Sequence, residues 1–301
     1  MRRLSRREFL RRAGIVGVTT CIAGKEFLGL MEAEAAVKPT LSVASGESPE
    51  LLVRKAIDGL GGIKKFVKPG NIVVIKPNLA WARRPEQAAN TNPEVISALI
   101  KLCKQAGAKR ITVLDHSCDN TIAAFGVNGV RDAVKAGARL VAADKKFMFQ
   151  GIKIPKGKLL KADECAKEIL TADVFINVPI AKVHGSTLIT AGMKNLMGTN
   201  WDRQAWHHSA DLDQCIADYS TAVKPDLIVL DAVRILLTRG PKGPGQTKDV
   251  GQVIAGTDPV AIDSYAATLL GKDPHQVSHI KYAAALGLGQ MDLKKVTLRR
   301  T

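Results

Sequence analysis

The chain has 301 residues, of which 46% are hydrophobic and only 4% aromatic, and it carries a formal net charge of +16 at pH 7. This length and a mean hydropathy of +0.02 are typical of a globular protein with one large α/β domain or two lobes. The charge favours anionic partners, and we exclude nucleic acid because so few aromatic side chains are available for base stacking.

The first 35 residues combine the features of an export signal. Residues 5–10, Ser-Arg-Arg-Glu-Phe-Leu, resemble the twin-arginine signature. An apolar run follows over 13–24, and Ala33-Glu34-Ala35 suits signal peptidase. The apolar run is shorter than the roughly 20 residues that a membrane-spanning helix needs, so cleavage near Ala35 is favoured over a retained anchor.

We therefore expect residues 1–35 to be a twin-arginine signal peptide and residues 36–301 to form a single α/β domain. The twin-arginine route carries folded proteins, often with a cofactor in place, so the expected location is periplasmic or otherwise extracytoplasmic. The expected partners are the twin-arginine translocase during export, an anionic small molecule and, if a cofactor is present, a redox partner protein.

The first half of the chain alternates between apolar strand runs and helix patterns. Strands are expected at 41–44, 71–76, 110–115 and 139–142, and helices at 49–60, 93–106 and 127–136. Asn92 as N-cap and Pro93 at the first helical position open the second of these helices. Residues 145–162 are less regular and predict a β excursion or hairpin.

The second half repeats the pattern. Helical segments are expected at 163–170, 188–197, 211–222 and 258–270 and from Pro274 onward, and strands at 173–178, 225–231, 252–255 and 295–298. A polar loop is expected between 178 and 188. The fold class predicted from this alternation is α/β, with a mostly parallel three-layer sheet, helices on both faces and a small β-rich excursion.

Polar side chains follow four of the predicted strands. Ligands in open α/β sheets gather beyond the carboxyl ends of the strands, so these residues are expected to share one site. They are Lys76, Asn78, Asp115, His116, Cys118, Lys182, His184 and Asp231. We expect His184 or His116 to move a proton, and Asp115 or Asp231 to orient that histidine or to help bind a metal.

Further cations could hold an anionic substrate. Lys194 and Asn195 lie in a helical segment between two methionines, and Lys194 could clamp an anion together with Lys76 and Lys182. Arg239 begins a Gly/Pro-rich loop that could close over the anion. Each residue also has a simpler explanation, since a strand-end aspartate often caps a turn and a lysine is often just solvated.

No compact cofactor motif accompanies these residues. Cys103, Cys118, Cys165 and Cys215 lie far apart, without the spacing that loads an iron–sulphur cluster. Weak metal candidates are His184, His207, Asp258 and Asp263, although Asp258 before Pro259 also predicts a helix cap. The cofactor stays open between a metal ion and an iron–sulphur cluster, and the sequence lacks a dinucleotide fingerprint, a P-loop and a serine-hydrolase elbow.

Several motifs together resemble the domain-of-unknown-function 362 family. They are Lys76-Pro77-Asn78, residues 92–95, residues 173–179, Lys182 to His184, residues 194–198 and residues 256–261. The resemblance covers nearly all of residues 70–290. It implies a shared pocket around Lys76, Asn78, Lys182, His184, Lys194, Asn195 and Asp258. Some family members are labelled iron–sulphur cluster-binding, but this chain lacks their cysteine module.

Two hypotheses about function follow. The first is an exported enzyme, redox-linked if a cofactor is present, that acts on an anionic small molecule at the strand-end site. The second is a periplasmic binding or accessory protein that holds an anion or cofactor for a partner enzyme. Turnover separates the two, because an accessory protein retains its ligand and converts nothing.

Overall fold

The computed structural model describes residues 38–46 and 48–301, so the predicted signal peptide lies outside the described residues. The described strands are β1 (Thr40–Ser45), β2 (Ile72–Pro77), β3 (Arg110–Asp115), β4 (Arg139–Ala142), β5 (Phe149–Lys153), β6 (Ala162–Ala166), β7 (Val174–Val178), β8 (Ile180–His184), β9 (Leu188–Thr190), β10 (Leu227–Leu236), β11 (Thr247–Gly256) and β12 (Thr297–Arg300). The described α-helices are α2 (Pro49–Asp58), α3 (Pro93–Gln105), α4 (Thr121–Val127), α5 (Val130–Ala133), α6 (Lys167–Leu170), α7 (Gly192–Asn195), α8 (Arg203–His207), α9 (Leu212–Ala222), α10 (Pro259–Leu269) and α11 (Ser278–Ala285).

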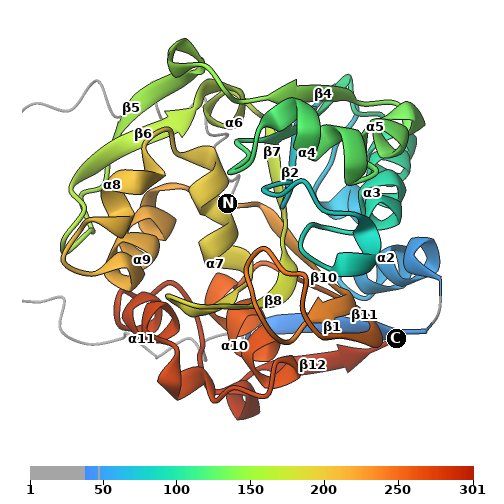
Figure 1. Cartoon of the computed structure of the whole chain (residues 1–301). Helices are drawn as coiled ribbons and strands as arrows, with labels where there is room; N and C mark the ends of the chain where they lie inside the picture. Colours follow the sequence, from blue (N-terminus) through green and yellow to red (C-terminus); the bar gives the residue numbers. More distant parts are fainter. Residues whose placement is uncertain (1–37, 47) are drawn as a thin grey trace, which may run out of the picture.

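A single large sheet organises the described part of the chain (Figure 1). It has ten strands, with β12-β1-β11-β10-β7-β2-β3-β4 as its main order; β8 pairs with β10, and β9 pairs with β8. The run from β10 to β4 is entirely parallel, whereas β11 pairs antiparallel with both β10 and β1. The prediction of a mostly parallel α/β sheet is therefore confirmed.

Helices cover both faces of the sheet and create two hydrophobic cores (Figure 1). On β2, Val73 and Ile75 belong to the core beneath α2–α5, while Val74 belongs to the core beneath α6–α11. Successive side chains of a strand point to opposite faces, so a nearly continuous apolar run is what a strand buried on both faces requires. None of the helices in the described ranges is long and apolar enough to cross a membrane.

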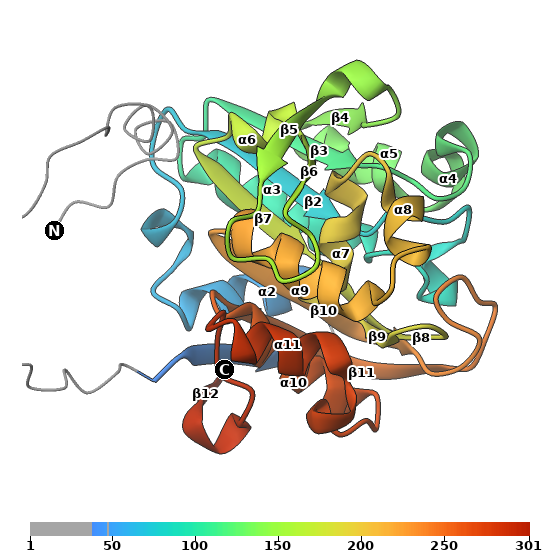
Figure 2. The same cartoon turned by 90° about the vertical axis from the view of Figure 1, so that its left-hand side faces the viewer.

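The predicted β excursion is confirmed as the hairpin β5–β6, which lies beside α8 and α9 (Figures 1 and 2). Its connection is held by the buried Asp218 of α9, whose Oδ2 accepts hydrogen bonds from the backbone N–H groups of Leu159 and Leu160. On β6, Asp163 accepts a hydrogen bond of 2.6 Å from the Trp206 indole. The hairpin is therefore tied to both α8 and α9.

Four predicted elements were wrong in detail. Residues 163–166 continue β6 instead of starting a helix, and the helix expected over 127–136 is broken into α4, α5 and a 3₁₀ turn. The segment expected to be helical over 188–197 forms β9 and then α7, followed by the 3₁₀ helix η5 (Leu196–Thr199). The expected polar loop after 178 is instead β8, which pairs parallel with β10 and antiparallel with β9.

Candidate functional site

A cleft of about 390 Å³ opens at the carboxyl ends of β2 and β3. Its other walls come from β8, from α7 with η5, from α8, and from Pro241 in the loop between β10 and β11. Nine of the residues predicted for the site line it: Lys76, Asn78, Asp115, His116, Lys182, His184, Lys194, Asn195 and His207. Residues from three of the four predicted strand ends therefore meet at this cleft, and Asp231 from the fourth does not.

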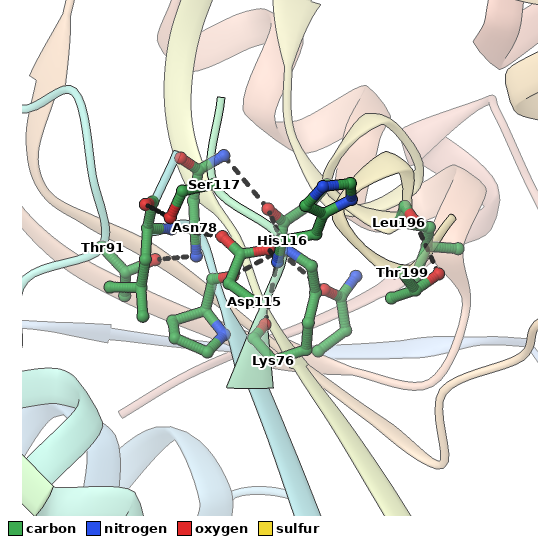
Figure 3. A network of polar contacts seen from close by, with 12 residues as sticks. Lys76, Asn78, Thr91, Asp115, His116, Ser117, Leu196 and Thr199 are labelled. Atoms are coloured by element: carbon green, nitrogen blue, oxygen red, sulfur yellow. Dashed lines mark hydrogen bonds and ion pairs between the residues drawn. The ribbon is translucent and has the colours of Figure 1, made fainter. Parts of the chain in front are cut away.

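A buried polar network under the cleft, which we call the polar floor, consists of the lining residues Lys76, Asn78, Asp115 and Asn195 and of Asn177, which bonds to Asn195 but does not line the cleft. Asn195 is its centre. Its Oδ1 accepts hydrogen bonds of 3.1 Å from both Lys76 Nζ and Asn78 Nδ2. Its Nδ2 donates to Asn177 Oδ1 at 2.8 Å and to the Lys76 carbonyl at 3.3 Å. One amide from α7 therefore links strands β2 and β7, and the network around Lys76 and Asp115 is visible in Figure 3.

Lys76 and Asp115 form a buried ion pair within this floor, 2.8 Å apart, with 1% and 2% of their side chains exposed. Asp115 also accepts hydrogen bonds from the backbone N–H groups of Leu79 at 2.6 Å and His116 at 2.9 Å. Burial lowers the pKa of Lys76, and the Asp115 carboxylate opposes that shift. Because these groups neutralise one another, Lys76 contributes little free positive charge to the cleft.

Gly198 lets η5 approach this ion pair closely. A Cβ atom at this position would lie 2.1 Å from Asp115 Oδ1 and 2.7 Å from Lys76 Nζ. The glycine carbonyl accepts a hydrogen bond of 3.2 Å from the His116 N–H. A side chain at position 198 would therefore displace the floor, which explains the glycine at the end of the Lys-Asn-Leu-Met-Gly motif.

Lys182 lies on β8 with 1% of its surface exposed and has no carboxylate within bonding distance among the described residues. Its Nζ donates to Asn78 Oδ1 at 3.3 Å and to the Ala89 carbonyl at 2.5 Å. Burial lowers the pKa of Lys182 to about 7. An amine in this setting is close to half protonated at neutral pH.

Lys194 on α7 is more isolated still. Lys194 is 7% exposed, and its ammonium group donates a hydrogen bond of 2.9 Å to the Met197 thioether sulphur. A thioether is a weak acceptor, so it compensates poorly for the lost hydration of a cation. Burial lowers the pKa of Lys194 to about 8.

The three histidines of the cleft are all disfavoured as cations. Burial, then the charges of Lys194 and Lys182, lower the pKa of His184 to about 3, and its Nδ1 accepts a hydrogen bond of 3.1 Å from the Ser186 N–H. The neutral ring therefore carries its proton on Nε2. Burial also lowers the pKa values of His116 and His207. The His116 ring is fixed by stacking on Trp201 and by a 3.0 Å contact between its Nδ1 and the Asn200 carbonyl.

Cys118, which the sequence placed among the strand-end groups, also lines the cleft, and so does Arg203, which was not predicted as a site residue. The Arg203 guanidinium donates to the carbonyls of His116 and Ser117 and adds another positive charge. Cys118 is an exposed thiol at the end of the loop that follows β3. Cys118 was visible in the sequence beside His116, whereas Arg203 begins a short helix that gave no periodic signal.

Four predicted site residues lie elsewhere. Asp231 is fully buried and accepts backbone hydrogen bonds from Asn92 at 2.7 Å and Val233 at 3.0 Å, and burial raises its pKa to about 6. It is not at a strand end, because β10 continues to Leu236. Arg239 is exposed in the following loop, which reaches the cleft through Pro241 instead.

Asp258 and Asp263 act as helix caps. Asp258 Oδ1 accepts the Ala261 N–H at 2.8 Å, which confirms the cap predicted for α10. Asp263 accepts the N–H groups of Gly192 at 2.5 Å and Met193 at 3.1 Å, at the start of α7. Neither carboxylate lines the cleft that contains His184 and His207, so the candidate metal ligands are not brought together.

The described residues give no support to a metal centre or cluster. Within 38–46 and 48–301, no three His, Cys, Asp or Glu side chains gather closely enough to hold a metal ion. The described cysteines are dispersed as well, with Cys103, Cys165 and Cys215 buried and Cys118 exposed. The site is instead dominated by amines, amides and imidazoles.

The fold and the cleft define an α/β protein with a cationic, largely buried site at the carboxyl edge of its sheet. The chain belongs to the family described as Domain of unknown function (DUF362), which matches residues 73–268. It is 30% identical over 256 residues to the thylakoid-associated protein sll1697 of Synechocystis sp., covering 78% of this chain and 74% of that protein.

Two solved structures resemble the chain at a distance. The lactate racemase apoprotein from Thermoanaerobacterium thermosaccharolyticum matches 81% of this chain and 56% of its own, at 15% identity and a TM-score of 0.45. A protein from Thermotoga maritima matches 75% of this chain and 60% of its own, at 10% identity and a TM-score of 0.46. The chain thus spans less than two thirds of either solved protein, and resemblance at this level carries no functional information.

Proposed function

We propose that this protein is an enzyme that binds a small organic anion in the cleft and transfers a proton to or from it. The observation that carries the proposal is the pair of buried amines, Lys182 and Lys194, that converge on one cleft without a carboxylate partner in the described structure. Burying an uncompensated ammonium group is costly, so a fold that buries two of them gains most when an anion arrives.

The charges of the cleft favour a dianion. Lys76 is offset by Asp115, which leaves Lys182, Lys194 and Arg203 as positive charges facing the cavity. A bound anion stabilises the protonated amines and raises their pKa values. Since the pKa values of Lys182 and Lys194 are about 7 and about 8 without a ligand, binding near pH 8 should take up protons.

The same groups offer acid–base chemistry. Lys182, with a pKa of about 7, has the balance between free amine and ammonium that suits a general base near neutral pH. His184, with a pKa of about 3, is too weak a base for that role, but its Nε2–H can donate a hydrogen bond to the anion. Lys194 would hold the anionic group while Lys182 exchanges the proton.

Calorimetry and isotope exchange test this function on the purified protein. Inorganic phosphate and succinate should bind more tightly than acetate at pH 8, and the binding enthalpy should depend on the buffer because protons are taken up. A panel of organic anions incubated with the protein in D₂O should include one that gains deuterium. Absence of anion binding would contradict the proposal, whereas binding without deuterium incorporation would favour the accessory role.

We also propose that the protein is exported by the twin-arginine translocase to the periplasm or another extracytoplasmic compartment. Support for export comes from Arg6 and Arg7, the apolar run after them and the Ala33-Glu34-Ala35 site. The proposed redox partner protein rests on this export signal alone. In an exporting host, the wild-type chain should fractionate with the periplasm, and Arg6→Lys/Arg7→Lys should leave it in the cytoplasm. Equal distribution of the two proteins would rule out this route.

A further inference from the structure

A second polar cluster, which does not line the cleft, joins α9, α10 and α11. His279 of α11 is completely buried, and its Nδ1 lies 2.7 Å from Asp213 Oδ1 of α9. On its other side, its Nε2 lies 3.7 Å from Asp263 Oδ2 of α10, which is also completely buried. The imidazole therefore stands between two carboxylates.

This arrangement favours the charged imidazolium. Nδ1 donates to Asp213, while Nε2 lacks a hydrogen-bond partner within the described residues but faces the carboxylate of Asp263. Burial lowers the pKa of His279, but the two carboxylates more than offset this and the net shift is upward. The cation in turn compensates for the buried negative charge of Asp263.

Asp263 connects this cluster to the cleft. Its two carboxylate oxygens accept the first two N–H groups of α7, and a Cβ on Gly192 would lie only 2.8 Å from Asp263 Oδ1. The next residues of the same helix turn are Lys194 and Asn195. The Gly192 carbonyl is also held, by a hydrogen bond of 2.8 Å from Asn177 of the polar floor.

The cluster is also coupled to the cleft by charge. Asp213 raises the pKa of Lys194, against the larger effect of burial, and His279 contributes to the lowered pKa of His184. A four-residue helix such as α7 has little stability of its own, so its position depends on these tertiary contacts.

We infer that Asp213, His279 and Asp263 form a positioning cluster, in which the His279 cation holds the Asp263 carboxylate against the start of α7 and thereby fixes Lys194 and Asn195 in the cleft. This inference rests on the proposed function, since the cleft is the same anion site. None of the three residues lines the cleft, so they act through Lys194 and Asn195 and not on the ligand.

The decisive comparison is between Asp263→Asn and Asp258→Asn in the full-length protein. Both substitutions remove a carboxylate that accepts two backbone N–H groups. The Asp258 carboxylate, however, accepts them from Ala261 of α10 and from Gln290 in a later loop. Asp263→Asn and His279→Gln should each weaken inorganic phosphate binding about tenfold, and Asp258→Asn should leave it unchanged. Amide hydrogen exchange over 192–195 should accelerate in the first two proteins only.

NMR titration of the His279 ring measures its pKa, which a general loss of stability would not change. Its pKa should fall in Asp263→Asn and stay at the wild-type value in Asp258→Asn. Unchanged exchange over 192–195 in both Asp263→Asn and His279→Gln would overturn the inference. If the wild-type protein failed to bind phosphate, the proposed function would fail, while the exchange and titration results would still decide whether the cluster positions α7.

Discussion

Replacing Lys194 with methionine is expected to abolish most anion binding and at the same time to stabilise the protein. Truncating one member of a buried charge pair typically costs about 2–5 kcal/mol, so phosphate affinity at pH 7 should fall about 30-fold or more. The unliganded protein no longer has to bury an ammonium group whose hydrogen-bond partner is a thioether. Its free energy of unfolding should therefore rise.

The size of that gain follows from the pKa of Lys194. A shift from 10.5 to about 8 corresponds to about 3 kcal/mol of lost stability when the amine is charged, at about 1.4 kcal/mol per pKa unit. Calorimetry gives the affinity, and urea unfolding at pH 7 gives the stability. A lower phosphate affinity together with a higher free energy of unfolding would identify Lys194 as a ligand-binding residue. A loss of both affinity and stability would assign it a structural role instead.

The matched control is Lys109→Met, which removes an exposed lysine that does not line the cleft. Surface substitutions of this kind usually change stability by less than about 0.5 kcal/mol. Phosphate affinity and stability should both stay close to the wild-type values. A large loss of affinity in this control would mean that overall charge, and not Lys194, attracts the anion.

The second large effect concerns pH and Lys182. Its folded-state pKa of about 7 lies below the ordinary value of 10.5, so the unfolded chain binds more protons between these two values. Stability therefore rises with pH across this window, and it is lost progressively as the pH falls from about 10.5 to about 7. From pH 7 to pH 9, Lys182 alone should contribute an increase of about 2 kcal/mol in the free energy of unfolding.

Lys182→Met should remove this increment, leaving a smaller rise from Lys194, whose pKa of about 8 lies in the same range. Urea unfolding at half-unit pH steps would measure the slope in both proteins. Lys109→Met should keep the wild-type slope. If Lys182→Met also kept the wild-type slope, Lys182 would ionise in the folded protein like an exposed lysine, and its assignment as a base would be withdrawn.

The sequence predicted the parallel sheet and the edge at which the cleft lies. Strand β3 matches its expected bounds of 110–115, because a short apolar run that ends in a polar residue marks both a strand and its exposed end. The same logic placed Lys76, Asn78 and Asp115 correctly at the cleft. These residues follow strands that are buried on both faces, and such strands give the clearest signal in a sequence.

The remaining parts of the site depend on contacts between segments that are distant in the sequence. Asp231 looked like a strand end, but pairing with β8 and β11 extends β10 to Leu236. The helix expected over 188–197 is divided because Asp263, some seventy residues later, sets where α7 begins. His279 lies in the last helix and shows no local pattern that would connect it to the cleft.

The four bonds of Asn195 have a consequence for how such proteins can diverge. Both lone-pair directions of its oxygen and both protons of its nitrogen are used, by partners from β2, β7 and the loop after β2. No other side chain of that size supplies two acceptors and two donors in this geometry. A new substrate preference is therefore expected to be acquired at other lining residues such as Trp81, Met197 or Pro241, while the Asn195 amide is inherited unchanged.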